Sequence, residues 1–287
     1  VSPETGQSTG TPRKLLDGKY RFQSNVNWSP DSKEFVFSRR DENITDDIWA
    51  ISVNDGSLTK ITSTPGCNDD APTWSPDGKT IAYGRWEESP SLWLSSVDGK
   101  NKRKIIDTEH RCIPIWAPDG QWILLDERPW LIRLADKKDF PLTIPDEVGS
   151  FFSWSIDTKK MLFYRPSYDY RSVLKVVSST GGPILELGKQ VTLWPYEHFW
   201  STDSNIIITT GEDKEGNPVF WIIPLGQGEP MPLKLDVQIE KPMPLCLSRD
   251  FKLLTFSNVI NDETEDLWIV PISLEEGRTI GPAVKVF

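Results

Sequence analysis

The side chains that most often carry catalysis are scarce in this sequence. Its two histidines are His110 and His198, which excludes a metal site built from several histidines. Neither a Gly-x-Ser-x-Gly nucleophile turn nor a His-Glu-x-x-His metal motif occurs. Many aspartates, such as Asp77 in Ser-Pro-Asp-Gly, occupy turn-forming stretches, where a carboxylate bonds backbone amides. We therefore expect a protein that is not an enzyme and needs no metal or cofactor.

A set of arginine and aromatic residues is better suited to binding. Its members are expected in loops that follow equivalent strands, or in loops that join one repeat to the next. The set comprises Arg39, Arg85, Trp86, Arg128, Arg165, Tyr168, Tyr170, Arg171, Trp194, Tyr196 and His198. Guanidinium groups offer paired donors to carboxylates, and arginine, tryptophan and tyrosine are enriched at binding hot spots. These residues predict a site for a protein segment or a small anionic ligand. The alternative is that each arginine pairs with a nearby acid and braces its own loop.

A repeated hairpin must position these loops. In the stretch Pro72–Tyr83, Trp74 ends one strand, Ser-Pro-Asp-Gly forms a tight turn, and Ile81 lies in the next strand. Copies of this anchor begin at Trp28, Trp74, Trp116, Trp154, Trp200 and Leu247. A second apolar stretch, often with tryptophan, follows each anchor by roughly twenty residues. We expect it to form the third strand of its unit. A period of about 40 to 50 residues with four strands per unit is typical of a β-propeller.

The repeat predicts an all-β fold, a six-bladed β-propeller with four-stranded antiparallel blades. We expect one domain over residues 1–287. Its blades should span approximately residues 22–62, 63–106, 107–144, 145–187, 188–235 and 236–287. The two chain ends resemble each other, so either one could supply the outer strand of the last blade. We favour residues 11–16 as the strand latch that completes it.

Three further features can be assigned a structural role. Most of the 13 tryptophans are expected to pack between blades. The run Asn68-Asp69-Asp70 could hold a cation, but we expect a hydrogen-bonded turn. A disulfide between Cys67 and Cys112 is conceivable because both lie in equivalent loops, although we expect unpaired thiols.

The Trp-Ser-Pro-Asp-Gly anchor at residues 74–78 resembles the repeat of the TolB-like six-bladed propellers. The resemblance covers essentially the whole chain, and the copy at Leu247 departs most from it. It implies partner binding at the channel mouth, as TolB binds the peptidoglycan-associated lipoprotein. Similar WD40-like blades also occur as gates of prolyl oligopeptidases and as sensor ectodomains. The resemblance further implies a bacterial protein outside the cytoplasm, either periplasmic or secreted.

Composition narrows the choice of partner. The net charge of −10 makes the backbone of a nucleic acid an unfavourable partner. No run of about 18 apolar residues is present, so we expect no membrane insertion. We expect a monomeric, non-catalytic module that binds a protein segment or small anionic ligand at the channel mouth. The alternatives are a gating propeller or channel-site enzyme, peptidase-associated or like a polysaccharide lyase, and the sensor ectodomain of a longer membrane protein.

Overall fold

The computed structural model describes residues 15, 26–40, 45–125, 130–136, 138–141, 152–164, 173–194, 198–237, 242–248, 252–261 and 264–285. These residues form strands, turns and irregular segments, and no helix occurs among them. The chain divides into two compact units. We call Arg13–Pro145 the N-terminal unit, and Val1–Pro12 together with Asp146–Phe287 the C-terminal unit.

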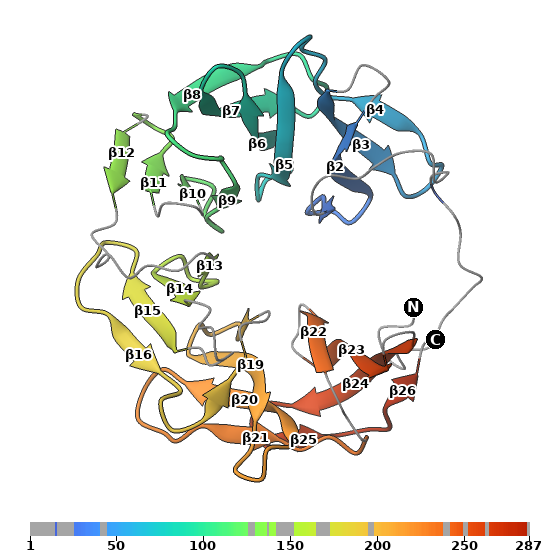
Figure 1. Ribbon diagram of the computed structural model, residues 1–287, viewed down its shortest axis with the longest axis vertical. Coiled ribbons are helices and arrows are strands. Elements are labelled where there is room, and N and C mark those ends of the chain that lie inside the picture. Colours follow the sequence, from blue (N-terminus) through green and yellow to red (C-terminus); the bar gives the residue numbers. More distant parts are fainter. Residues whose placement is uncertain are drawn as a thin grey trace. The chain divides into compact units, whose positions relative to one another are not determined.

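The described residues of the N-terminal unit form three antiparallel sheets of four strands, coloured blue to green in Figure 1. The first sheet contains β1 (Asn27–Trp28), β2 (Glu34–Arg40), β3 (Asp46–Ser52) and β4 (Leu58–Lys60). The second contains β5 (Asn68–Trp74), β6 (Thr80–Trp86), β7 (Pro90–Ser96) and β8 (Arg103–Asp107). The third contains β9 (Pro114–Trp116), β10 (Trp122–Leu125), β11 (Trp130–Arg133) and β12 (Lys138–Pro141).

The described residues of the C-terminal unit also form three antiparallel sheets, coloured yellow-green to red in Figure 1. The fourth sheet contains β13 (Phe152–Trp154), β14 (Lys160–Tyr164), β15 (Leu174–Ser178) and β16 (Leu185–Leu187). The fifth contains β17 (Thr192–Leu193), β18 (Phe199–Trp200), β19 (Ile206–Glu212), β20 (Pro218–Pro224) and β21 (Met231–Leu233). The sixth contains β22 (Pro242–Leu247), β23 (Leu253–Asn261), β24 (Thr264–Ser273), β25 (Arg278–Thr279) and β26 (Val284–Lys285).

Each of these six sheets coincides with one expected blade, and the apolar stretches expected as third strands lie in β3, β7, β11, β15, β20 and β24. That six blades complete one propeller domain stays a prediction. The outer position of the sixth sheet is filled by β26, which pairs with Trp268 and Ile269 of β24. The expected latch at residues 11–16 lies outside the described residues, except for Leu15, and stays a prediction.

The anchor turns have the geometry that their sequence predicts. Gly78 and Gly120 adopt φ of 69° and 70°, the left-handed conformation that glycine enters without steric cost. In the first, fourth and fifth sheets, Ser32, Thr158 and Ser204 adopt it instead, at 60°, 63° and 57°. The expected capping role of the turn aspartates is seen in five sheets, where a backbone amide donates to the carboxylate of Asp31, Asp77, Asp119, Asp157 or Asp203. In all of these except the third sheet, the anchor serine also donates to that carboxylate.

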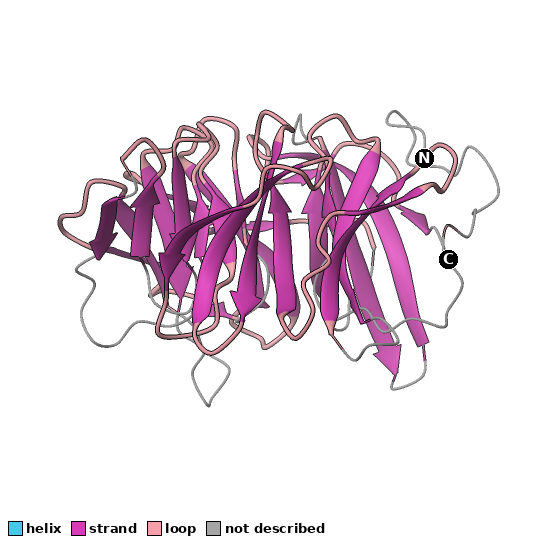
Figure 2. Cartoon of the chain, turned by 90° about the horizontal axis from the view of Figure 1, so that it is seen from above, coloured by secondary structure: helices cyan, strands magenta, loops and turns pink. Residues whose placement is uncertain are grey.

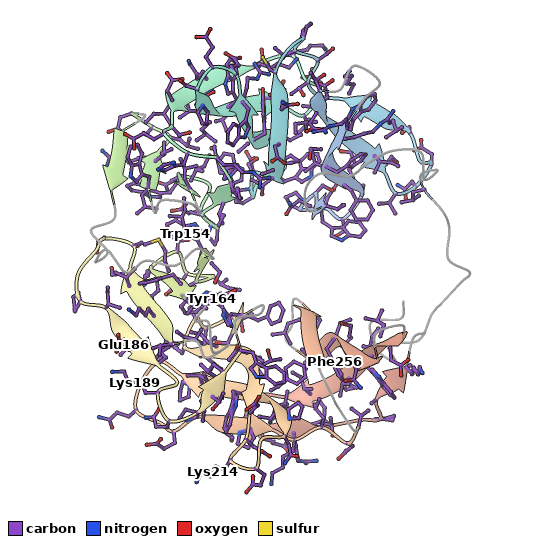
Figure 3. The ribbon with its side chains drawn as sticks, in the orientation of Figure 1. Trp154, Tyr164, Glu186, Lys189, Lys214 and Phe256 are labelled. Atoms are coloured by element: carbon purple, nitrogen blue, oxygen red, sulfur yellow. The ribbon has the colours of Figure 1, made fainter. Side chains whose placement is uncertain are left out.

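Apolar side chains join neighbouring sheets within each unit. In the N-terminal unit, Val36 and Ile48 of the first sheet cluster with Trp74 and Tyr83 of the second. In the C-terminal unit, Phe220 of β20 meets Phe256 of β23, with ring centroids 5.3 Å apart (Figure 3). A four-stranded sheet has two faces to cover, so neighbouring sheets provide most of the core.

The tryptophans follow the expected pattern in part. Trp74, Trp200 and Trp221 are buried in clusters that join neighbouring sheets, and Trp154 is also buried. Trp28 differs, because it is 52% exposed and lies against Phe35 with ring centroids 3.8 Å apart.

Candidate functional site

Two sets of loops lie at opposite ends of each sheet. Successive turns between antiparallel strands alternate between the two ends, as the strands of each unit show in Figure 2. One end carries the anchor turns, and we call it the turn face. The other end carries the loops between second and third strands and the loops between sheets, and we call it the loop face. The arginine and aromatic set was expected on the loop face.

Arg85 lies at the loop face of the second sheet, but its guanidinium is buried. The residue is 4% exposed. Its Nε and Nη2 donate to the two carboxylate oxygens of Asp69 at 2.6 and 2.9 Å, and Nη2 also donates to Thr64 at 2.8 Å. The guanidinium stacks over Trp93, 4.2 Å from the ring centroid. This arrangement fits the alternative in which the arginine pairs with a nearby acid and braces its own loop, because the guanidinium is fully occupied by neighbouring side chains.

Arg39 occupies the matching place in the first sheet and is also buried, with 7% of its surface exposed. Its guanidinium lies over Trp49, 4.6 Å from the ring centroid. The next residue, Arg40, forms a two-point ion pair with Asp46 across β2 and β3, with distances of 3.0 and 2.8 Å. In this unit the described arginines at the predicted positions are therefore held by their own sheets.

The run Asn68-Asp69-Asp70 connects three sheets. The side chain of Asn68 accepts a hydrogen bond from the amide of Asp46 in the first sheet at 3.0 Å. Asp70 forms an ion pair with Arg111, which precedes the third sheet. The run is hydrogen-bonded as expected, but it lies in strand β5 and does not form the expected turn. Among the described residues, no group of three or more potential metal ligands is present.

Other side chains remain accessible on the loop face of the N-terminal unit. Trp86 is 39% exposed and is followed by the exposed Glu87, and Glu109 and His110 are exposed in the segment after β8. Arg111 keeps 39% of its side chain exposed despite its ion pair. A hollow of about 20 Å³ is lined by Glu109, His110, Arg111 and Trp130, among others. It has room for little more than one water molecule, so this surface offers contact area rather than an enclosed pocket.

The C-terminal unit places two members of the predicted set. Trp194 donates from Nε1 to Glu212 at 3.2 Å. His198 lies 2.6 Å from Thr209 through Nδ1, and its ring meets Tyr164 edge-on at 4.5 Å between centroids. Tyr164 is labelled in Figure 3. Burial lowers the pKa of His198 to about 3, so the imidazole is neutral. This histidine acts as a packed hydrogen-bonding group between the fourth and fifth sheets.

The remaining members cannot be placed. Arg128, Arg165, Tyr168, Tyr170, Arg171 and Tyr196 lie outside the described residues. Their grouping at a channel mouth stays a prediction.

Several residues that shape this face were missed from the sequence. Asp69 was read as part of a turn, yet β5 begins at Asn68 and pairs Asp69 directly with Arg85. Strict alternation along an extended β5 was the signal that could have revealed it. Arg111 was missed because its partner Asp70 is 41 residues away in the chain.

Cys67 and Cys112 form no disulfide with each other, as expected. Cys112 is buried and Cys67 is half-buried. Burial and the nearby carboxylate of Glu87, 3.5 Å away, raise the pKa of the Cys67 thiol. A protonated thiol is a weak nucleophile, so this site gives no sign of a reactive cysteine.

Sequence comparison finds partial relatives. No family model matches the chain. An uncharacterized protein of Agrobacterium fabrum is 30% identical over 124 residues, 42% of this chain and 40% of that protein. The uncharacterized peptidase YuxL of Bacillus subtilis is 32% identical over 87 residues, 29% of this chain and 13% of the peptidase. The Tol-Pal system protein TolB 1 of Novosphingobium aromaticivorans is 32% identical over 74 residues, 25% of this chain and 16% of that protein. The chain thus matches less than half the length of each curated relative.

Solved structures decide the fold. TolB of Acinetobacter baumannii superposes with a TM-score of 0.56 at 15% identity, over 84% of this chain and 61% of that one. The chain is an all-β propeller with a TolB-like fold. The resemblance inferred from the anchor repeat is confirmed at this level.

The expectation that the protein is not an enzyme is contradicted. Acylaminoacyl peptidase of Pyrococcus horikoshii gives a TM-score of 0.61 at 15% identity, over 92% of this propeller and 45% of that chain. Oligogalacturonate lyase of Vibrio parahaemolyticus gives 0.56 at 16% identity, over 74% of this propeller and 68% of that chain. With the partial match to a B. subtilis peptidase, these likenesses show that propellers of this fold occur in enzymes, so an enzyme is not excluded. The scarcity of histidine did not exclude one, since it bears only on chemistry that needs histidine in this chain.

In the described residues, no helix is long and apolar enough to cross a membrane.

Proposed function

We propose that this propeller recognises peptide segments at the loop face of its N-terminal unit and serves a peptidase. The observation that carries the proposal is that Trp86 and Arg111 are both accessible on that face, together with the exposed carboxylates of Glu87 and Glu109. Arg111 also lines the hollow of about 20 Å³. An extended peptide can use aromatic contact area and both signs of charge without needing a deep pocket.

The buried arginines argue against a small anionic ligand in this unit. Arg39 and Arg85 are 7% and 4% exposed, so their guanidinium groups cannot reach a ligand without unpacking the sheets. Glu87, Glu88 and Glu109 are exposed on the same face and would repel an anion. A peptide segment, with its own amide groups and mixed side chains, fits this surface better.

The comparisons favour a peptidase as the setting. The peptidase of P. horikoshii shares its fold with 92% of this chain but only 45% of its own, so the likeness is to one part of that enzyme. The β-propeller domain of the trilobed protease of Pyrococcus furiosus is similar over 90% of this chain, with a TM-score of 0.60.

We place the protein outside the cytoplasm, as a monomer that does not insert into a membrane. Within the C-terminal unit, Trp194 belongs to the set proposed for recognition, whereas His198 packs against Thr209 and Tyr164.

A second candidate is a TolB-type interaction module that binds a folded protein partner. The match to TolB 1 over 74 residues and the TolB structure favour it. The two candidates differ in whether a short, unfolded peptide is enough for binding.

The proposal is tested with a random 12-residue peptide library displayed on phage, selected against the purified chain. A recovered peptide is synthesised with a fluorescent label, and its affinity is measured by anisotropy. We expect the double variant Trp86→Ala/Arg111→Gln to bind at least tenfold more weakly than the unaltered chain. The matched control Leu58→Ala/Lys102→Gln removes another exposed apolar residue and another exposed cation, and should bind normally.

The outcomes are separable. Failure to select any peptide, or equal loss in both double variants, contradicts peptide recognition at this face. Incubation of the bound peptide with the chain, followed by mass spectrometry, then locates the chemistry. Cleavage assigns catalysis to this chain, and an intact bound peptide shows that this chain binds the peptide without cleaving it.

A further inference from the structure

The turn face of the N-terminal unit contains a cavity larger than the hollow beside Arg111. It lies between the second and third sheets and has a volume of about 450 Å³. This is within the range of about 300–1,000 Å³ typical of small-molecule sites. The residues that matter most in its lining are Asp77, Leu94, Arg103, Trp116, Asp119 and Leu134.

Arg103, which lines this cavity, differs in charge from the residues at the same position of the other repeats. It lies opposite Leu94 in the outer strand of its sheet. The outer-strand residues at the matching position of the first, third, fourth and fifth sheets are uncharged; they are Thr59, Phe140, Leu185 and Met231. Arg103 is exposed, and within the described part of the chain it has no ion pair. Its guanidinium is available to a ligand, unlike that of Arg85.

Asp119 is the second departure. In four other sheets the turn aspartate accepts a hydrogen bond from the anchor serine, as Asp77 does from Ser75 at 2.6 Å. In the third sheet Ala117 replaces that serine, and Gln121 stands where the second sheet has Lys79. The hydrogen bond recorded for Asp119 comes from the amide of Gln121 at 2.9 Å. Its carboxylate therefore keeps acceptor capacity that its counterparts use internally.

The rest of the lining is apolar and aromatic. Trp116 is half-buried and packs in the cluster that also contains Leu94 and Leu134. An aromatic face next to carboxylate acceptors suits a sugar ring, because the C–H face of the ring packs on the indole while hydroxyls donate to the carboxylates. A single guanidinium at the rim adds a two-point partner for a carboxylate.

We propose that this cavity binds an acidic saccharide unit. Trp116 contacts the face of the sugar ring, Asp119 and Asp77 accept its hydroxyl hydrogen bonds, and Arg103 pairs with its carboxylate. The two departures from the repeat, at residues 103 and 117, meet at this one cavity, which argues for a built site rather than a packing gap. The site is independent of peptide recognition at the loop face.

Calorimetric titration with two matched disaccharides tests this proposal. Cellobiouronic acid carries one carboxylate, and cellobiose is its neutral counterpart. We expect the acid to bind and cellobiose to bind at least tenfold more weakly. Arg103→Thr introduces the residue of the first sheet and should abolish that preference. Asp119→Asn should weaken both sugars.

Lys102→Thr is the control, because it removes the neighbouring exposed cation and leaves the cavity unchanged. Normal binding by Lys102→Thr together with loss in Arg103→Thr supports the site. Equal losses in the two variants would indicate general charge attraction and overturn the proposal, as would equal affinity for both sugars or no heat from either at millimolar concentration. Circular dichroism of each variant confirms that the sheets are intact.

Discussion

The two ends of the sheets in the N-terminal unit use arginine in opposite ways. At the loop face, Arg85 is 4% exposed and paired with Asp69. At the turn face, Arg103 is exposed at the mouth of a cavity of about 450 Å³. Both residues belong to the second sheet. The comparison shows that an arginine with an acid in the neighbouring strand braces the fold. An arginine without such an acid can contact a ligand.

The largest loss of stability is expected when the buried guanidinium of Arg85 is removed. Arg85→Gln should destabilise the protein by about 3–5 kcal/mol, because it leaves the carboxylate of Asp69 buried without its partner. Arg111→Gln should cost less than about 1 kcal/mol, since that ion pair is partly solvated. Denaturant unfolding measures both. Similar losses in the two variants would show that the buried and exposed arginines do not differ in this way.

Acid should weaken the C-terminal unit through His198. Burial holds its pKa at about 3, below the ordinary value of 6.5, so the unfolded chain binds the proton more readily. Stability contributed by the neutral imidazole is complete above about pH 6.5 and falls as the pH drops toward 3. Between pH 7 and 5 the loss should be about 2 kcal/mol. In His198→Gln this part of the pH dependence should vanish, and an unchanged dependence would assign it to other groups.

Close approach of the second and third sheets gives a smaller test. A Cβ atom on Gly84 would lie 2.3 Å from the carbonyl oxygen of Cys112. Gly84→Ala should therefore cost about 1–3 kcal/mol through strain in the neighbouring backbone. Thermal unfolding measures the effect. A neutral result would show that the backbone at Cys112 can move away at little cost. The close contact with Gly84 would then not hold the two sheets in place.

The smallest expected effect is a gain. Ala117→Ser restores the anchor hydroxyl and should add a hydrogen bond to Asp119, worth about 0.5–1.5 kcal/mol. The same change should weaken binding of cellobiouronic acid, because it occupies an acceptor oxygen in the cavity. Stabilisation without any loss of sugar affinity would remove Asp119 from the proposed site. Unfolding of Ala117→Ser measures the gain in stability, and calorimetric titration of the same variant measures the affinity for the sugar.

The sequence predicted the fold better than the site. The anchor residues, such as Trp74 and Gly78, act locally, so their turn geometry can be inferred from a few neighbours. The partner of Arg85 was missed because β5 starts earlier than expected and bends at Ala71, a non-glycine residue with φ of 50°. The partner of Arg111 and the cavity beside Trp116 depend on how adjacent sheets pack, which a local pattern does not encode.

The central claim is that exposed loop-face residues recognise peptide while the buried arginines only hold the sheets. The most direct measurement is the affinity of a selected 12-residue peptide for Trp86→Ala/Arg111→Gln and for Arg85→Gln, each at a temperature where it is folded. The account predicts at least a tenfold loss of affinity in the first variant and a change below about threefold in the second. Normal binding by Trp86→Ala/Arg111→Gln, or the larger loss in folded Arg85→Gln, would contradict it.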